Sequence, residues 1–267
     1  MSIASSAEHR VVAYNSARTS ENKIHDDVVA RQYGFAGGLV PGVDVYAYMS
    51  HAAVRQWGRD WLQRGWMSAR FLKPVYEGEE VTVRTEPAAE NGLEIAAMSR
   101  GEACGIGTAR LPAVPPTPPS TGEFPYRPLP DPKPPASPER LPAGRLLGAY
   151  DCVHTASDAE AYLENVRETL PLYATDGLVH PGFLLRLANW SLRENVRLGP
   201  WIHVSSEVQN FAAVALGERL SARGRVLDSF ERKGHKFVEL DVAVFTADAP
   251  ALRIRHTAIY APRKSQD

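Results

Sequence analysis

Prolines divide the chain near its midpoint into two parts of similar size. Thirteen of its 21 prolines fall between Pro112 and Pro142. Proline fixes φ and donates no backbone hydrogen bond, so this stretch cannot form a helix interior or a central strand. We expect an extended connector of the polyproline type rather than a tract that binds an SH3-type partner. The expected organisation is one unit over residues 1–111, a linker over 112–142 and a second unit over 143–267.

The two units resemble each other in sequence. VVAYNSARTS and GGLVPGVDVYAYMSHAAVRQWG precede the linker, and LLGAYDCVHTAS and DGLVHPGFLLRLANWSLREN follow it. Anchors that recur in the same order at a nearly constant offset indicate an internal repeat. The anchors are Tyr14 with Tyr150 (offset 136), Pro41-Gly42 with Pro181-Gly182 (offset 140), and Gly78 with Gly217 (offset 139).

Each unit has the same expected order of elements. A short strand comes first, over His9–Tyr14 and Leu146–Tyr150, and a buried helix then begins at the Pro-Gly pair. After each helix the apolar residues alternate with a period of two, which indicates strands separated by glycine-containing turns. One helix followed by a run of antiparallel strands, twice over, is an α+β pattern. The expected strands cover residues 67–75, 79–87, 93–100 and 103–111, then 203–211, 218–230, 235–245 and 251–260.

Charge and composition exclude several classes of protein. The chain carries 30 Lys plus Arg against 31 Asp plus Glu, so it lacks the basic excess typical of nucleic-acid-binding proteins. It has no membrane-length apolar run, and its amino terminus, MSIASSAEHR, has no leader pattern. Cys104 and Cys152 form no CxxC pair, which argues against a disulfide scaffold or a thiolate zinc site. We therefore expect a cytoplasmic protein that binds neither nucleic acid nor membrane.

Residues 20–43, SENKIHDDVVARQYGFAGGLVPGV, carry a recognisable motif. They resemble the D-x-N-P-x-H segment and helix start of MaoC-like, (R)-specific enoyl-thioester hydratases, and RFLKPVYEGEEV resembles the strand that follows the helix in that group. The resemblance implies a double hotdog protein, in which two sheets each wrap around a helix and pack as a pseudo-dimer. The residues in register are Asn22, Ile24, His25, Ala30, Gly34, Phe35, Leu39 and Gly42.

Two positions depart from that family's pattern. Ser20 stands where the family has its catalytic carboxylate, and Pro41 stands where it has a histidine before the helix glycine. The second unit has no N-x-x-H, so at most one site of the family type is expected, in the first unit. Asp26 and Asp27 are expected to form the acidic first turn of a short helix instead of replacing the carboxylate.

The candidate site residues follow from the resemblance and from their chemistry. His25 is the candidate acid–base group because imidazole titrates near neutral pH. Gly42 is the candidate oxyanion donor, because the free N–H groups of a helix start carry the positive end of its dipole. Asn22 completes the expected catalytic set by orienting water or the thioester. The expected substrate-binding residues are Ser20, Glu21 (the nearest replacement carboxylate), Phe35 and Tyr46.

Three functions remain open at this stage. The first is a hydro-lyase such as an enoyl-CoA hydratase or 3-hydroxyacyl dehydratase, the second is an acyl-CoA thioesterase, and the third is an inactive hotdog protein that only binds acyl thioesters. The expected partner is an acyl-CoA or acyl-carrier-protein thioester. No metal or cofactor is expected, because the histidines never fall at metal-ligand spacing. Either a monomer of two hotdogs or a homodimer fits.

Overall fold

The computed structural model describes residues 8–114, 116–247 and 249–264. Residues 1–7 lie outside these described ranges, and with them most of the amino-terminal segment that is expected to lack a leader pattern. Ten strands form one sheet in the order β1-β3-β4-β5-β2-β7-β10-β9-β8-β6, and every pairing is antiparallel. The second half of this order mirrors the first. The internal repeat is therefore a repeat of topology, and the α+β class is confirmed.

The expected strands and central helices are present in both halves. The first half contains β1 (His9–Val12), a 3-10 turn (Lys23–His25), α1 (Asp27–Arg31), α2 (Gly42–Arg64), β2 (Trp66–Phe71), β3 (Glu80–Ala88), a 3-10 turn (Ala89–Asn91), β4 (Gly92–Ser99) and β5 (Glu102–Arg110). The second contains β6 (Tyr150–Val153), α3 (Ala156–Asn165), α4 (Leu172–Asp176), α5 (Pro181–Asn195), β7 (Ile202–Asn210), β8 (Arg219–Arg232), β9 (His235–Thr246) and β10 (Ala249–Ala261).

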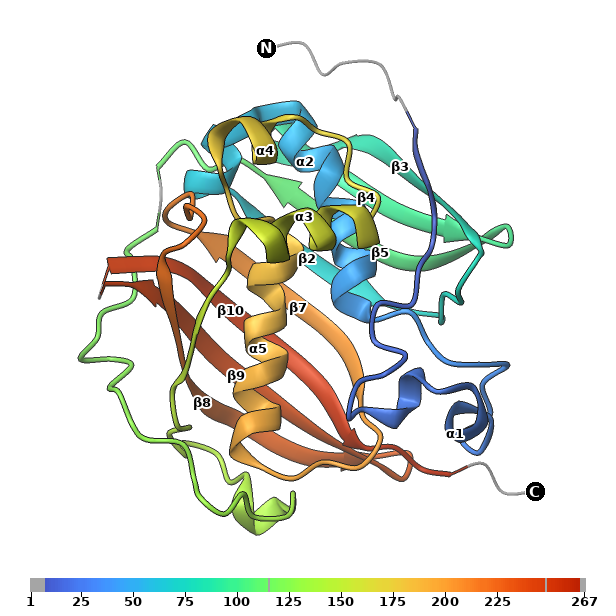
Figure 1. Ribbon diagram of the computed structural model, residues 1–267, viewed down its shortest axis with the longest axis vertical. Coiled ribbons are helices and arrows are strands. Elements are labelled where there is room, and N and C mark those ends of the chain that lie inside the picture. Colours follow the sequence, from blue (N-terminus) through green and yellow to red (C-terminus); the bar gives the residue numbers. More distant parts are fainter. Residues whose placement is uncertain (1–7, 115, 248, 265–267) are drawn as a thin grey trace.

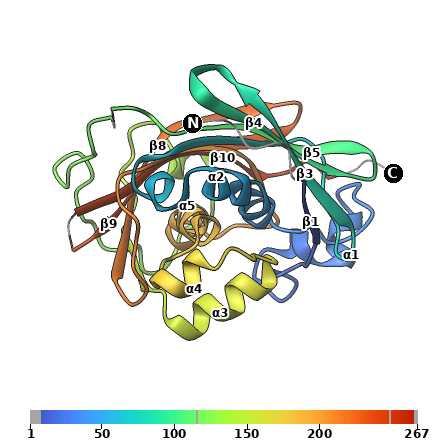
Figure 2. The same cartoon turned by 90° about the horizontal axis from the view of Figure 1, so that it is seen from above.

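The sheet curves around the two long helices (Figures 1 and 2). Seen from above, α2 and α5 lie against its concave face, and α3 and α4 cover the helices from the other side. Every residue of α2 from Val43 to Val54 is buried, as expected for this helix, and no polar face is exposed over its first three turns. The helix is interrupted at Gly58, whose φ of 57° lies in the left-handed region that glycine adopts most readily. Among the described residues, no helix is long and apolar enough to span a membrane.

The two halves join edge to edge in the middle of the sheet. β2 pairs with β7 in the register Trp66↔Gln209 to Arg70↔Ser205. Below this seam α2 packs on α5, and Asp44 of α2 forms a 2.7 Å ion pair with Arg186 of α5. One cluster of buried side chains, including Tyr46 and Leu185, runs through both halves.

The first strand of the second half is interrupted: Leu146 forms an isolated bridge with Arg225 of β8, and regular pairing with β8 begins only at Tyr150. Only Tyr150 of the expected strand over 146–150 lies in β6. Gly148 lies against the backbone of Pro128 and Leu129, and the side chain of Asn195 bonds its N–H and its carbonyl. These contacts hold residue 148 outside regular pairing with β8, so β6 begins two residues later.

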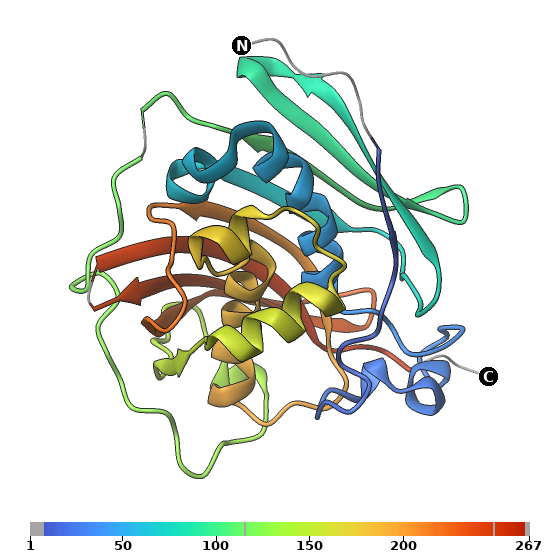
Figure 3. The same ribbon diagram turned by 45° about the horizontal axis from the view of Figure 1, so that its top comes forward.

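The proline-rich connection contains no strand among its described residues, and its one helical element is the 3-10 turn Pro138–Arg140. It runs along the β8–β9 side of the molecule, in green in Figures 1 and 3. Phe124 is 1% exposed and packs with Ala243 and Phe245, outside the main core cluster. The guanidinium carbons of Arg225 and Arg253 lie 5.1 and 5.3 Å from its ring centroid. The connection is therefore anchored to the sheet as well as joining the two halves.

We expect Phe124→Ala to lower the free energy of unfolding by about 3 kcal/mol or more, because a large buried ring is replaced by a cavity. Urea unfolding followed by circular dichroism measures this. Val114→Ala is the matched control, since Val114 lies on the same connection but is 81% exposed. It should change stability by less than about 0.5 kcal/mol. Equal effects of the two substitutions would contradict the anchoring role.

Candidate functional site

The start of α2 is open and uncapped. Pro41 is the N-cap residue and supplies no side-chain cap. Among the hydrogen bonds of the described residues, the N–H groups of Gly42 and Val43 have no acceptor. A Cβ on Gly42 would lie 3.1 Å from the phenyl ring of Phe71 and from Nδ1 of His203. The helix start therefore presents two free donors, with the dipole's positive end, in a narrow space.

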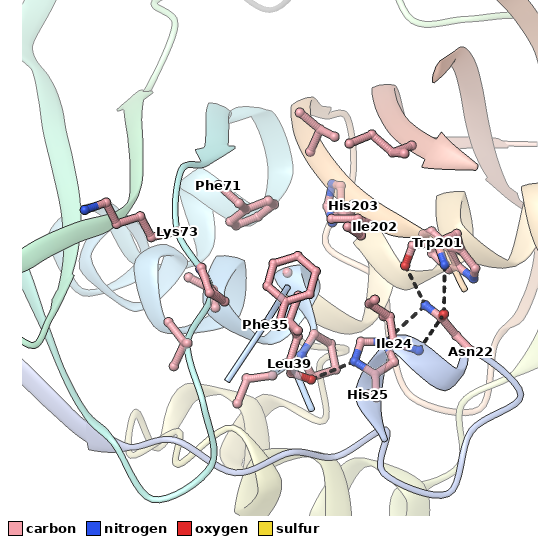
Figure 4. A pocket seen from close by; sticks show the side chains of 18 of the residues that line it. Asn22, Ile24, His25, Phe35, Leu39, Phe71, Lys73, Trp201, Ile202 and His203 are labelled. Carbon is pink, nitrogen blue, oxygen red and sulfur yellow. Dashed lines mark hydrogen bonds between the residues drawn. The ribbon is translucent and has the colours of Figure 1, made fainter. Parts of the chain in front are cut away.

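A pocket of about 240 Å³ opens at this helix start. Its volume is slightly below the range typical of sites for drug-sized ligands, so it suits a short acyl segment better than a whole thioester carrier. Figure 4 shows the rings of Phe35 and Phe71 pointing into it, with Lys73 at one side and His25 and Asn22 at the other. The second half completes the wall with Asn189, Trp201, Ile202, His203, Val204 and Ile259.

His25 is held in one tautomer by its neighbours. Its Nδ1 lies 2.7 Å from the carbonyl oxygen of Leu39, which can only accept, so Nδ1 carries the proton. Nε2 then carries the lone pair of the ring, and this lone pair accepts from Nδ2 of Asn22 at 3.3 Å. Burial lowers the pKa of His25 below its usual value of 6.5. His25 is therefore a neutral imidazole, with its basic nitrogen on the Asn22 side of the pocket.

Asn22 connects this loop to the other half of the protein. Its Oδ1 accepts from the N–H of Ile24 at 3.3 Å and from the N–H of Trp201 at 3.1 Å. Its Nδ2 donates to the carbonyl of Trp201 at 2.9 Å as well as to His25. Both amide hydrogens are engaged, so in this arrangement Asn22 positions His25 and is not free to bind a ligand.

The loop around His25 also depends on a close backbone approach. A Cβ on Gly38 would lie 2.1 Å from the carbonyl oxygen of His25, so only glycine fits there. The N–H of Gly38 donates to Asp27, and Asp26 caps the short helix α1 by accepting from Val28 and Val29. The expectation that these two aspartates serve the helix start and not the reaction fits this geometry.

The structure gathers four of the seven predicted site residues into one pocket and places three outside it. Asn22, His25, Phe35 and Gly42 line the pocket. Ser20 and Glu21 are not among its lining residues. The Oγ of Ser20 donates to the carbonyl of Asn22, and Glu21 is exposed. Tyr46 is fully buried in the main core, where burial raises the pKa of its hydroxyl.

Sequence reasoning missed His203 and Asn189. His203 is 7% exposed, and its Nδ1 has no hydrogen-bond partner among the described residues; neither has Oδ1 of Asn189. His203 touches the edge of Phe71, with ring centroids 4.7 Å apart. Both residues come from the second half, where no motif marks them, and only their buried, unpaired atoms identify them.

The corresponding helix start in the second half is closed. Nδ1 of His180 accepts from the N–H of Gly182, which caps α5. Glu168 accepts from His180 at 3.2 Å and from His51 at 2.8 Å, and these bonds outweigh burial and lower the pKa of the carboxyl. A Cβ on Gly182 would lie 2.3 Å from the hydroxyl of Tyr162. This helix start is therefore packed with side chains, and the site is confined to α2.

Comparisons with known proteins identify the fold. No protein-family profile matches the sequence, and no curated protein matches it significantly. Among solved structures, the chain is similar to Rv0216 of Mycobacterium tuberculosis, a double hotdog protein, with a TM-score of 0.66 at 17% identity over 97% of this chain and 96% of that one. The chain therefore has the double hotdog fold.

Two further structures share this fold. A proposed MaoC domain dehydratase from Chloroflexus aurantiacus J-10-fl matches with a TM-score of 0.68 at 10% identity, over 98% of this chain and 96% of the other. A proposed thioesterase from Novosphingobium aromaticivorans DSM 12444 matches with a TM-score of 0.55 at 12% identity, over 95% of each chain. The expected likeness to the MaoC-like double hotdog group is thus shown at the level of the fold.

We expect Asn22→Ala to destabilise the protein by about 1–3 kcal/mol, because Trp201 is left with a buried, unpaired N–H and carbonyl. Urea unfolding gives the free energy. Asn165→Ala at the end of α3 is the control, since its side chain forms no hydrogen bond among those of the described residues. A loss no larger than that of the control would show that Asn22 does not hold the loop to the second half.

Proposed function

We propose that the protein acts on acyl thioesters and that its reaction is the hydration of a short 2-enoyl thioester, or the reverse dehydration. One observation carries the proposal: a neutral imidazole base and an uncapped helix start line the same small, largely apolar pocket. A base and an oxyanion site are the two parts that this chemistry needs. The fold neighbours, described as MaoC-like dehydratases, support the same class of reaction.

The helix start has the geometry of an oxyanion site. The thioester oxygen gains negative charge as water adds to the β-carbon, and the N–H groups of Gly42 and Val43 donate to it. One well-placed donor stabilises such a transition state by about 3–4 kcal/mol. Gly42 lets the carbonyl approach closely because it has no side chain.

His25 moves the protons. A water first replaces Nδ2 of Asn22 as the hydrogen-bond donor to Nε2. Nε2 then takes a proton from this water as the water oxygen bonds to the β-carbon and the C=C electron pair moves to the α-carbon. The resulting imidazolium then returns a proton from Nε2 to the α-carbon, which restores the neutral ring. The carbonyl of Leu39, which accepts from Nδ1, keeps the ring oriented during both steps. A positioned base of this kind contributes about 10²–10⁴ in rate.

Thioester hydrolysis is the second candidate. Among the described residues that line the pocket there is no aspartate or glutamate, so the site lacks the carboxylate of the family motif. Hydrolysis needs only a base that activates water and an oxyanion site, both of which the pocket contains. The neighbour described as a thioesterase has the same fold and fits this alternative.

We expect the purified protein to hydrate crotonyl-CoA, followed as loss of enoyl absorbance, and His25→Ala to lower kcat/KM at least about 100-fold. His235→Ala is the control, because His235 lies at the β8–β9 turn and does not line the pocket. Release of thiol from butyryl-CoA without hydration of crotonyl-CoA would favour hydrolysis instead. Binding without turnover of either compound would leave a protein that only binds acyl thioesters.

The pH profile gives a separate prediction. The base works in its neutral form, and burial lowers the pKa of His25 from 6.5. The logarithm of kcat/KM should therefore be flat above pH 6.5 and should fall only as pH drops below that value. Steady-state kinetics between pH 4.5 and pH 8 measure this fall of kcat/KM at acidic pH. An ascending limb centred above pH 7 would contradict His25 as a neutral buried base.

A further inference from the structure

Three buried side chains form a hydrogen-bonded chain that leads from the pocket into the core of the second half. Nε2 of His203 lies 2.8 Å from Oγ of Ser206, and the same Oγ lies 2.9 Å from Nδ1 of His256. His203 and Ser206 belong to β7, and His256 belongs to β10. The three are 7%, 3% and 0% exposed. Polar groups buried so completely are normally paired, so each free atom in this chain needs an explanation.

The chain has one free atom at each end. At the inner end Nε2 of His256 has no hydrogen-bond partner among the described residues, and at the pocket end Nδ1 of His203 has none. Nδ1 of His203 would lie 3.1 Å from a Cβ on Gly42, and the edge of Phe71 packs on the same ring. In Figure 4 the ring of His203 stands beside Phe71 at the wall of the pocket. The free atom therefore lies next to the open start of α2.

The direction of the hydrogen bonds decides which ring nitrogen of His203 carries the hydrogen. If Nδ1 of His256 donates to Ser206 and Ser206 donates to Nε2 of His203, the unpaired N–H is Nδ1–H of His203; in the opposite direction it is Nε2–H of His256. Either direction leaves one buried N–H unpaired, but only the N–H of His203 lies beside the pocket, where a bound carbonyl oxygen can accept from it. Orphaned N–H donors are rare in proteins, so binding of a carbonyl oxygen favours the first arrangement.

We propose that Nδ1–H of His203 is a second oxyanion donor, which binds the thioester oxygen beside the free N–H groups of α2. The inference rests on the proposed function, because it names a further group for that same site. It applies equally to hydration and to hydrolysis, since both reactions place negative charge on that oxygen. His203 transfers no proton: it donates one hydrogen bond, which strengthens as the oxygen becomes charged.

His203 stays neutral in this role. Burial lowers its pKa well below the usual 6.5, and the neighbouring ring of His256, with centroids 4.4 Å apart, lowers it further. No carboxylate is among the described pocket-lining residues to oppose this. A neutral N–H avoids burying a charge next to the positive end of the helix. Ser206 and His256 are positioning residues, because they fix which nitrogen of His203 carries the hydrogen.

Kinetics on the full chain separate the two ring nitrogens. In asparagine the amide nitrogen is bonded to Cγ, as Nδ1 is in histidine, whereas glutamine places it near the position of Nε2. We expect His203→Gln to lower kcat about 10²–10³-fold with KM changed only a few-fold. His203→Asn should retain more activity than His203→Gln. Ser206→Ala should lower kcat, but kcat/KM should still fall at acidic pH as in the wild type, because His25 is unchanged. Equal losses in the Asn and Gln variants, or losses in KM alone, would overturn the proposal.

His154→Gln is the matched control for these variants. His154 is 2% exposed, stacks on Phe183 with centroids 3.6 Å apart, and also has unpaired ring nitrogens, but it does not line this pocket. The change in kcat of His154→Gln measures the effect of replacing a buried histidine that lies outside the pocket. A loss of kcat in His154→Gln as large as in His203→Gln would overturn a specific role for His203.

Two measurements do not depend on turnover. Nitrogen-15 NMR of histidine-labelled wild-type protein, with the inert amide analogue of butyryl-CoA bound, should show Nδ1 of His203 protonated, and an unprotonated Nδ1 in that complex would overturn the proposal even if every variant failed to fold. The inert amide analogue of butyryl-CoA, carbon-13-labelled at the carbonyl, is the binding probe. Its infrared carbonyl band should shift to lower frequency on binding and shift less in His203→Gln.

The outcomes with this probe distinguish the two proposals. Binding with an identical band in wild type and variant would overturn the role of His203 while leaving the thioester function intact. Failure of the wild-type protein to bind the probe would overturn both. A smaller shift in the variant supports both.

Discussion

The pairing of β2 with β7 is the interaction on which the rest of the structure depends. It joins two five-stranded sheets into one and sets α2 beside α5 on the concave face. It also brings the beginning of β7, with Trp201 just before it and His203 within it, against the helix start of the first half. Without this seam the pocket would lose one wall, and Asn22 would lose its partners on Trp201.

The two halves share a topology but treat their helix starts in opposite ways. In the first half Pro41 supplies no side-chain cap, and the segment after Asn22 leaves a pocket in front of Gly42. In the second half His180 caps α5, and Tyr162 of α3 packs onto Gly182. A capped, crowded helix start cannot bind an oxyanion, whereas an uncapped helix start has free backbone N–H donors. Both halves therefore have the same scaffold, but of the two long helices only α2 has an open start.

Several histidines lie in or beside the core, and their hydrogen bonds give them different roles. His25 has its Nδ1 proton fixed by a carbonyl, so its other nitrogen carries the lone pair. His180 and His51 bond the buried carboxylate of Glu168 and are used for structure. His203 ends a chain of hydrogen bonds with one atom free at the pocket. The partner of each ring, more than the residue type, decides what the ring can do.

The sequence by itself determined the architecture. Alternating strands, two Pro-Gly helix starts and a proline-rich divide require elements of set type and order, because backbone sterics and the period of burial act locally. The motif likewise marked Asn22, His25, Phe35 and Gly42, which are close enough in the chain to be read as one pattern. Only the tertiary structure decided what surrounds them. His203 and Asn189 reach the pocket through strand pairing and helix packing between residues far apart in the chain. The register of that pairing depends on the packing of the whole sheet, and no local pattern records it.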